Sequence, residues 1–230
     1  MGSGVNAFQR RRGWSFIMKQ KALIFTFVFA SVTLAVFVFR RQSSGPAMNL
    51  RPSVAVGEVL AEETSRLLGG KGNIVVIGRA SAMAGQSAGN EQITSLGAAL
   101  RRRASPKIAA TEWLPQPPRL SMNTSDLTAE QLVALIEKHP EANAFVVFAG
   151  LPPLSPPLAE KLTARSLKLL AVCGYGATLR RWLAAHVLAA AVVPRFGELP
   201  PGTPAPKTVK DWFSREFELL TPESIPQLPY

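Results

Sequence analysis

Short runs of aliphatic residues recur along most of this chain, and they constrain its fold more than any other feature does. A run of about five apolar residues bounded by turn-forming residues is typical of a strand that is buried on both faces. The runs cover residues 73–77, 107–111, 144–148, 168–172 and 188–193. Segments with apolar residues at helical spacing alternate with them. This alternation predicts βαβ units and therefore an α/β fold, a single three-layer lobe with a parallel sheet between two layers of helices.

The segments around these runs predict six helices. They cover residues 56–68, 91–103, 125–138, 158–164, 178–186 and 209–217. Ser125 or Asp126 is the expected N-cap of the third helix, because such side chains accept hydrogen bonds from the first unpaired backbone N–H groups. Trp182 lies at helical spacing from Leu179 and Leu183, which predicts a core position for its indole.

The stretch "LLGGKGNIVVIG" contains glycines and a lysine before a strand, so it has to be compared with a phosphate-binding loop. Such a loop follows a strand, opens a helix, and has Ser or Thr directly after its lysine. Here a helix comes first, the strand comes afterwards, and Lys71 is followed by Gly72. We therefore interpret Gly69 and Gly70 as the end of a helix and a turn into a buried strand, and not as a nucleotide site.

The chain is strongly basic, with a formal net charge of +11. Seven of its basic residues flank a single apolar run near the N-terminus, and subtracting these seven from +11 leaves +4 for the remainder. Basic patches interleaved with aromatic residues are absent from the sequence. We therefore expect the charge to mark a membrane boundary, and we expect no nucleic-acid partner.

That apolar run starts at Ala22, ends at Phe39 and carries no charge. At about 1.5 Å per residue it is just long enough to cross a hydrocarbon core of about 30 Å. A cleaved signal peptide is the alternative, but its apolar region usually covers about 7–15 residues and ends in small residues. Because this run is longer and is followed by Arg40 and Arg41, we expect a retained membrane anchor.

More basic residues precede this run than follow it, and this asymmetry predicts the topology. The positive-inside rule gives a single-pass inner-membrane protein with its N-terminus in the cytoplasm and its domain in the periplasm or outside. Met18 is an alternative start to Met1. The expected parts are a basic N-terminus (1–21), the anchor (22–39), a polar linker (40–53), an α/β domain (54–225) and a tail (226–230).

Few residues favour catalysis or metal binding. Cys173 is the only cysteine, so an internal disulfide is impossible, and no base is expected beside it. His139 is expected at the opposite edge of the sheet, and His186 at the end of a helix. Cys173 is therefore interpreted as a small buried residue, and Glu112 as a solvated loop residue. Two histidines and one cysteine fit no zinc pattern, so we expect no enzyme activity, no cofactor and no metal.

Ligands of open parallel sheets bind beyond the carboxyl ends of the strands, which we call the carboxyl edge. Trp113 follows the second predicted strand and is the best candidate for stacking against a ligand. The candidate ligand-binding residues at this edge are Arg79, Trp113, Gly150, Cys173 and Tyr175.

Several phrases of the sequence resemble one family. The stretches "GGKGNIVVIG", "LTAEQLVALIEKHPEANAFVVFAG" and "LKLLAVCGYGATLRRWLAAHVLAAAVVPRF" are similar, in this order, to the C-terminal lobe of type I periplasmic sugar-binding proteins, which lac-repressor-like ligand domains share. "EFELLTPESI" resembles the terminal strand and the segment near the hinge. The resemblance covers about residues 54–225, and it implies a sheet with one more strand and a sugar-like ligand.

The sequence also departs from this family at positions that would bind the sugar. In the family an Asp ends the strand where this chain has Val172, Cys173 and Gly174, and an Asn or Asp follows the strand that here continues into Gly150. Between Arg41 and Gly69 there is too little sequence for the family's N-terminal lobe, which we expect to have about 100 residues. We therefore expect a membrane-anchored, non-enzymatic module that acts mainly through protein contacts, in an envelope complex or as a homo-oligomer. The alternative is a receptor for a sugar-like solute that completes its pocket by oligomerisation.

Overall fold

The computed structural model describes residues 49–80, 87–103, 106–115, 127–195, 197 and 203–227. The expected basic N-terminus and anchor, including Ala22 and Phe39, lie outside these residues. Asn49 to Tyr230 form one compact unit. Within the described parts, no helix combines the length and the apolar character that a membrane crossing needs.

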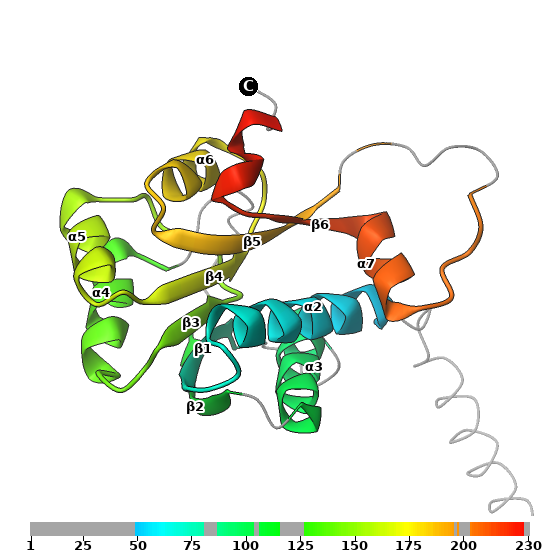
Figure 1. Ribbon diagram of the computed structural model, residues 1–230, viewed down its shortest axis with the longest axis horizontal. Coiled ribbons are helices and arrows are strands. Elements are labelled where there is room, and N and C mark those ends of the chain that lie inside the picture. The colour runs from blue at the N-terminus through cyan, green and yellow to red at the C-terminus, as the bar shows by residue number, and fades with distance from the viewer. Residues whose placement is uncertain are drawn as a thin grey trace, which may run out of the picture. The chain divides into compact units, whose positions relative to one another are not determined.

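A six-stranded sheet forms the centre of this unit (Figure 1). Its strands follow the order β2-β1-β3-β4-β5-β6, and all pairs are parallel except β5 with β6. The strands are β1 (Asn73–Arg79), β2 (Lys107–Leu114), β3 (Ala144–Val147), β4 (Lys168–Val172), β5 (Leu188–Pro194) and β6 (Phe217–Leu220). This arrangement confirms the predicted parallel sheet and the additional strand that the resemblance implied. The strand order reverses between β1 and β3, where ligands of such sheets bind.

Helices cover both faces of the sheet, as the three-layer prediction requires (Figure 1). The layer on one face consists of α2 (Arg51–Leu67), α3 (Ala88–Arg102) and α7 (Val209–Glu216). The layer on the other face consists of α4 (Ala129–Lys138), α5 (Pro156–Ala164) and α6 (Ala177–Ala184). A short 3₁₀-helix, η1 (Pro222–Gln227), follows β6.

Successive residues of a strand point to opposite faces, and the central strands therefore supply two cores. Ile74 and Val76 of β1 belong to the cluster under α2, α3 and α7, whereas Val75 and Ile77 belong to the cluster under α4, α5 and α6. All four side chains are fully buried. This explains why the strand sequences are continuously apolar and do not alternate.

The glycine-rich turn before β1 has the conformation that its sequence indicated. Gly69, Gly70 and Gly72 have φ angles of 59°, 77° and 118°, values that side chains disfavour. The backbone carbonyl of Gly72 accepts a hydrogen bond from Lys107 N at 2.9 Å, which joins the starts of β1 and β2. The turn therefore starts the sheet, as predicted.

Several element boundaries differ from the predictions, and three of them have a clear local reason. α2 begins at Arg51, because Pro52 suits the first turn of a helix. α4 begins at Ala129 with Thr128 as its N-cap; Thr128 Oγ1 accepts from Gln131 N, and Gln131 Oε1 accepts from Thr128 N, a complete capping box. The prediction of a cap at Ser125 or Asp126 was therefore wrong. β2 extends to Leu114, since residues 111–114 pair with β1.

Candidate functional site

The carboxyl edge of the sheet brings the predicted ligand residues into one row. Arg79 ends β1 and pairs with Leu114, and Trp113 of β2 pairs with Gly78. Gly150 follows β3, while Cys173 and Tyr175 follow β4. Because the strand order is β2-β1-β3-β4, these residues cover four neighbouring strands. The sequence therefore placed them at the correct edge, and their role in binding stays a prediction.

Trp113 is the one large hydrophobic side chain that stands exposed in the described part of the chain, with 48% of its surface accessible. Its ring packs over Gly78. A Cβ atom added to Gly78 would lie 2.8 Å from Trp113 Cζ3 and 2.6 Å from Ile93 Cδ1. The indole is thus supported on one side by Gly78, and about half of it remains open. A held aromatic ring loses little conformational entropy when a partner binds against it.

We call Gly150, Cys173 and Tyr175 the neutral rim, because none of the three is an acidic or basic residue. Burial raises the pKa of the Cys173 thiol to about 12, and its backbone N–H donates to Val192 O at 3.1 Å. A thiol with such a high pKa is a poor nucleophile, which agrees with the interpretation of Cys173 as a packing residue. Tyr175 is half-buried and packs against the core under α4, α5 and α6.

A buried tryptophan holds the loop behind Gly150. Trp182 of α6 is fully buried, as predicted, and its Nε1–H donates to the carbonyl of Pro152 at 2.8 Å. Gly150 has a φ of 81°, where glycine is strongly favoured. The indole therefore fixes the course of the chain two residues beyond Gly150, below the neutral rim.

A second cluster joins β2 to the end of α4, and the sequence did not predict it. Glu112 Oε1 lies 2.7 Å from His139 Nε2 and 2.8 Å from Lys138 Nζ. Glu141 Oε1 lies 3.3 Å from His139 Nδ1. Arg165 donates to the carbonyls of Ile136 and Pro140, both at 2.6 Å, and to that of His139 at 3.3 Å. We call the five charged or ionisable residues the ionic corner; they are Glu112, Lys138, His139, Glu141 and Arg165.

The ionic corner corrects the expectation for Glu112 and adds an unexpected contact for His139. Glu112 was predicted in a solvated loop, but it lies in β2 and its side chain is only 22% exposed. His139 lies at the end of α4, just before β3 begins, and therefore at the expected edge of the sheet. Its contact with Glu112 was not expected. Glu112 and His139 are 27 residues apart in the sequence, and no short-range sequence pattern predicts a contact over that separation. The hydrogen bond from Lys138, followed by that from His139, holds the pKa of Glu112 below its ordinary value of 4.5, so Glu112 is an ionised structural residue.

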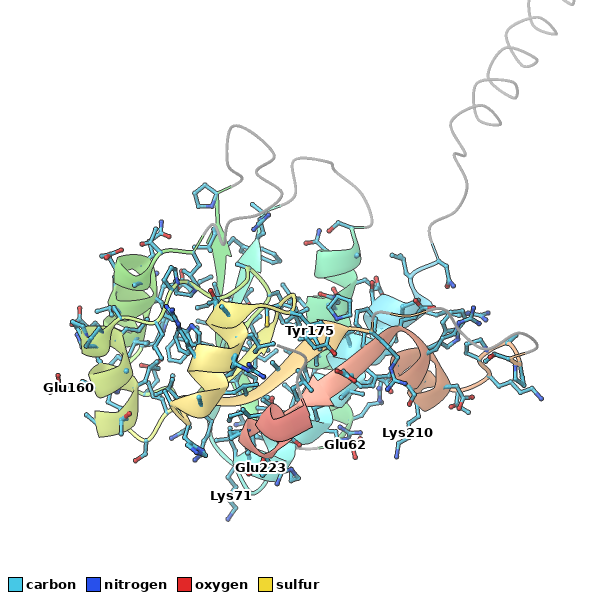
Figure 2. The ribbon with its side chains drawn as sticks, turned by 90° about the horizontal axis from the view of Figure 1, so that it is seen from above. Glu62, Lys71, Glu160, Tyr175, Lys210 and Glu223 are labelled. Carbon is cyan, nitrogen blue, oxygen red and sulfur yellow. The ribbon has the colours of Figure 1, made fainter. Side chains whose placement is uncertain are left out.

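Three cavities that described residues line include no residue of the row. One of about 310 Å³ lies at the amino edge, where the parallel strands begin, between the end of α2 and η1; its lining includes Arg66, Lys168, His186 and Glu223. In Figure 2, Lys71 and Glu223 both lie on the lower side of the view, away from Tyr175. Within the described residues, no three His, Cys, Asp or Glu side chains are placed to hold a metal ion.

Solved structures that this chain resembles in fold include sugar-binding proteins. GanP, a glucose-galactose binding protein from Geobacillus stearothermophilus, aligns with a TM-score of 0.52 at 16% identity, over 76% of this chain and 61% of that one. AraP, an arabinose binding protein from the same organism, aligns with a TM-score of 0.53 at 11% identity, over 77% and 63%.

A sugar-binding protein of a sugar ABC transporter from Bacillus halodurans aligns with a TM-score of 0.51 at 14% identity, over 75% of this chain and 63% of that one. The fold is that of a type I periplasmic-binding-protein-like lobe. The chain covers less than two thirds of the length of each of these three proteins. No protein-family model matches the sequence, and no curated protein matches it either.

Proposed function

We propose that this chain is a non-enzymatic binding module that is tethered to the inner membrane and presents its domain in the periplasm. The carboxyl edge of the sheet, with Trp113 and the neutral rim, is its contact surface. Its main partner is a protein of an envelope complex. The observation that carries this proposal is the half-exposed ring of Trp113 at an edge whose central positions are neutral.

The chemistry of the row supports a protein partner over a tightly held sugar. A sugar site needs polar side chains that pair with hydroxyl groups, together with an aromatic face. Gly150 and Cys173 supply no such groups, since one has no side chain and the other is a largely buried thiol. A fixed aromatic ring beside neutral residues is instead typical of the centre of protein interfaces.

The second candidate is a receptor for a sugar-like solute that completes its pocket by oligomerisation. The open ring face of Trp113 favours it, because such a face can stack on a sugar ring. The fold agrees with it, as the three proteins of similar structure are described as sugar-binding proteins. A second copy of the chain would have to supply the polar groups that the neutral rim lacks.

Calorimetric titration of the purified full-length chain in detergent with glucose, galactose and arabinose distinguishes the two candidates. The protein-contact module predicts no heat of binding at millimolar sugar. A micromolar dissociation constant that Trp113→Ala weakens at least tenfold would establish the receptor instead. Trp212→Ala is the matched control, because Trp212 belongs to α7, outside the row, and packs against the core under α2, α3 and α7.

A photo-crosslinking amino acid at position 113 tests the protein contact itself. We expect one defined adduct with a membrane-complex protein in intact cells and none from position 71, since Lys71 is exposed at the amino edge. Adducts that form equally from both positions would contradict the assignment of the carboxyl edge as the contact surface.

A further inference from the structure

β2 forms one edge of the sheet, and its length distinguishes it from the strand at the other edge. The sheet begins with β2 and ends with β6; β2 has 8 residues, whereas β6 has 4. Among the described residues, β1 is the one strand that pairs with β2 (Figure 1). Proteins usually shorten or cover edge strands, because the unpaired backbone groups of an edge can bind another chain. The long edge at β2 is therefore a candidate for such binding.

The hydrogen bonds between β1 and β2 determine which backbone groups of β2 face outward. Leu114 O accepts from Ala80 N at 2.9 Å, so the backbone groups of Leu114 face β1. The N–H and C=O of one residue point to the same side of a strand, and this side alternates from each residue to the next. Because the pairing is regular over residues 110–114, Thr111 and Trp113 direct their N–H and C=O groups away from the sheet.

The side chain of Trp113 adds an apolar contact at the same place. The indole is 48% exposed and is held over Gly78. Side chains on the same face of two neighbouring strands lie about 4.5–5.5 Å apart, and an aromatic residue pairs well with a β-branched or aromatic neighbour. An extended segment beside β2 would therefore bond to the backbone of Trp113 and also place an apolar side chain against its ring.

The start of β2 is positively charged, which indicates the chemistry of the segment at that end. Lys107 is exposed. A Cβ atom on Gly97 would lie 3.5 Å from Arg101 Nη1 and 3.5 Å from Ile108 Cδ1, so the Arg101 guanidinium lies near the first residues of β2. Glu112, the carboxylate of this strand, is paired in the ionic corner. Since opposite charges on neighbouring strands attract, an acidic side chain suits the Lys107 end of a bound segment.

We propose that the protein partner binds by adding an extended segment to the sheet beside β2. This inference rests on the proposed function, because it specifies how the partner engages the surface that contains Trp113. The segment pairs with the outward backbone groups of Thr111 and Trp113, has an apolar residue against the indole, and has an acidic residue near Lys107. In this mode of binding, main-chain hydrogen bonds provide affinity and the side chains provide specificity.

Thr111→Pro tests the main-chain contact in intact cells that carry the photo-crosslinking amino acid at position 113. Proline lacks the N–H and is tolerated in an edge strand where that N–H points outward. We expect the yield of the defined adduct to fall at least tenfold, whereas Thr111→Val keeps the N–H and should keep the yield. An unchanged yield with Thr111→Pro would overturn the strand addition alone. Absence of any adduct from position 113 in the otherwise unaltered chain would refute the proposed protein contact itself.

Hydrogen exchange on the purified adduct decides the question independently of whether Thr111→Pro folds. The amides of Thr111 and Trp113 should exchange at least tenfold more slowly in the adduct than in the free full-length chain, because they become bonded to the added segment. Equal exchange in the adduct and the free chain would overturn the inference. An adduct of two copies of this chain would also overturn it, since β2 would then pair with itself.

Lys107→Glu tests the expected acidic residue of the partner. The substitution should lower the yield of the adduct at least threefold, because it places like charges on neighbouring strands. Arg181→Glu is the matched control, since Arg181 is exposed on α6, and it should leave the yield unchanged. Equal yields for both variants would overturn the acidic character of the segment.

Discussion

The neutral rim and the ionic corner use opposite chemistry. In the ionic corner, the carboxylate of Glu112 contacts both Lys138 and His139, and Arg165 donates a hydrogen bond to the carbonyl of Ile136 near the end of α4. In the neutral rim, Cys173 is un-ionised and Gly150 has no side chain. The charged groups hold elements together, whereas the neutral rim, which we propose as part of the contact surface, has no acidic or basic side chain. Charge in this domain is thus mainly structural.

The largest effect is expected below the neutral rim, for Trp182→Ala. Removing a fully buried indole leaves a cavity and an unpaired Pro152 carbonyl, so unfolding should become easier by about 3–5 kcal/mol. Urea denaturation of the detergent-solubilised chain measures this. Trp182→Phe keeps most of the packing and should lose about half as much. A loss under about 1 kcal/mol for Trp182→Ala would show that the indole does not support this region.

The next effect is expected in the ionic corner, for Arg165→Met. The substitution keeps much of the apolar part of the side chain but removes charge-assisted hydrogen bonds to three carbonyls. Each such hydrogen bond contributes at most about 3 kcal/mol to the free energy of unfolding. We expect a net loss of about 2 kcal/mol in the same urea assay. Arg181→Met on the exposed face of α6 is the matched control and should stay within about 0.5 kcal/mol. Equal losses of stability for Arg165→Met and Arg181→Met would show that the hydrogen bonds from Arg165 to the carbonyls at the end of α4 do not stabilise the domain.

A smaller and pH-dependent effect is expected for Glu112→Gln. Because the pKa of Glu112 is lowered in the folded state, its ionised form adds stability at pH values above its ordinary value of 4.5, and this contribution is lost as the pH falls through the folded pKa. The variant should therefore be about 1 kcal/mol less stable at pH 7, and the difference should shrink below pH 4.5.

Thermal unfolding of both proteins between pH 3.5 and 8 measures this dependence. Glu160→Gln is the control, since Glu160 is exposed on α5. A difference between the wild type and Glu112→Gln that stays constant down to pH 3.5 would mean that the Glu112 carboxylate is not what stabilises the corner.

The smallest effect is expected at Cys173, which should hardly react. A pKa raised from 9.0 to about 12 lowers the thiolate fraction at pH 8 by roughly a thousandfold. Iodoacetamide should therefore modify the native chain at least a hundredfold more slowly than the chain in 8 M urea. Rapid alkylation of the folded protein would show that the neutral rim contains an accessible thiolate and would reopen a nucleophilic role.

The sequence by itself determined the parallel sheet and the edge that carries the candidate site. Runs such as 144–148 are apolar at every position, which only burial on both faces explains, and the helices between them force parallel pairing. The edge then follows from chain direction, so Arg79, Gly150 and Cys173 could be placed in one row. Trp182 could be assigned to the core because its neighbours Leu179 and Leu183 share its helical face.

Only the tertiary structure decided how the charged residues are used and how the ring of Trp113 is supported. The contact of Glu112 with His139 joins residues that are far apart in the sequence, and side chains at such separations carry no periodic signal. The support of Trp113 by Gly78 depends on the register between β1 and β2, which the sequence of neither strand fixes alone. Periodicity reports which faces are buried, whereas contacts across elements depend on how those faces pack in three dimensions.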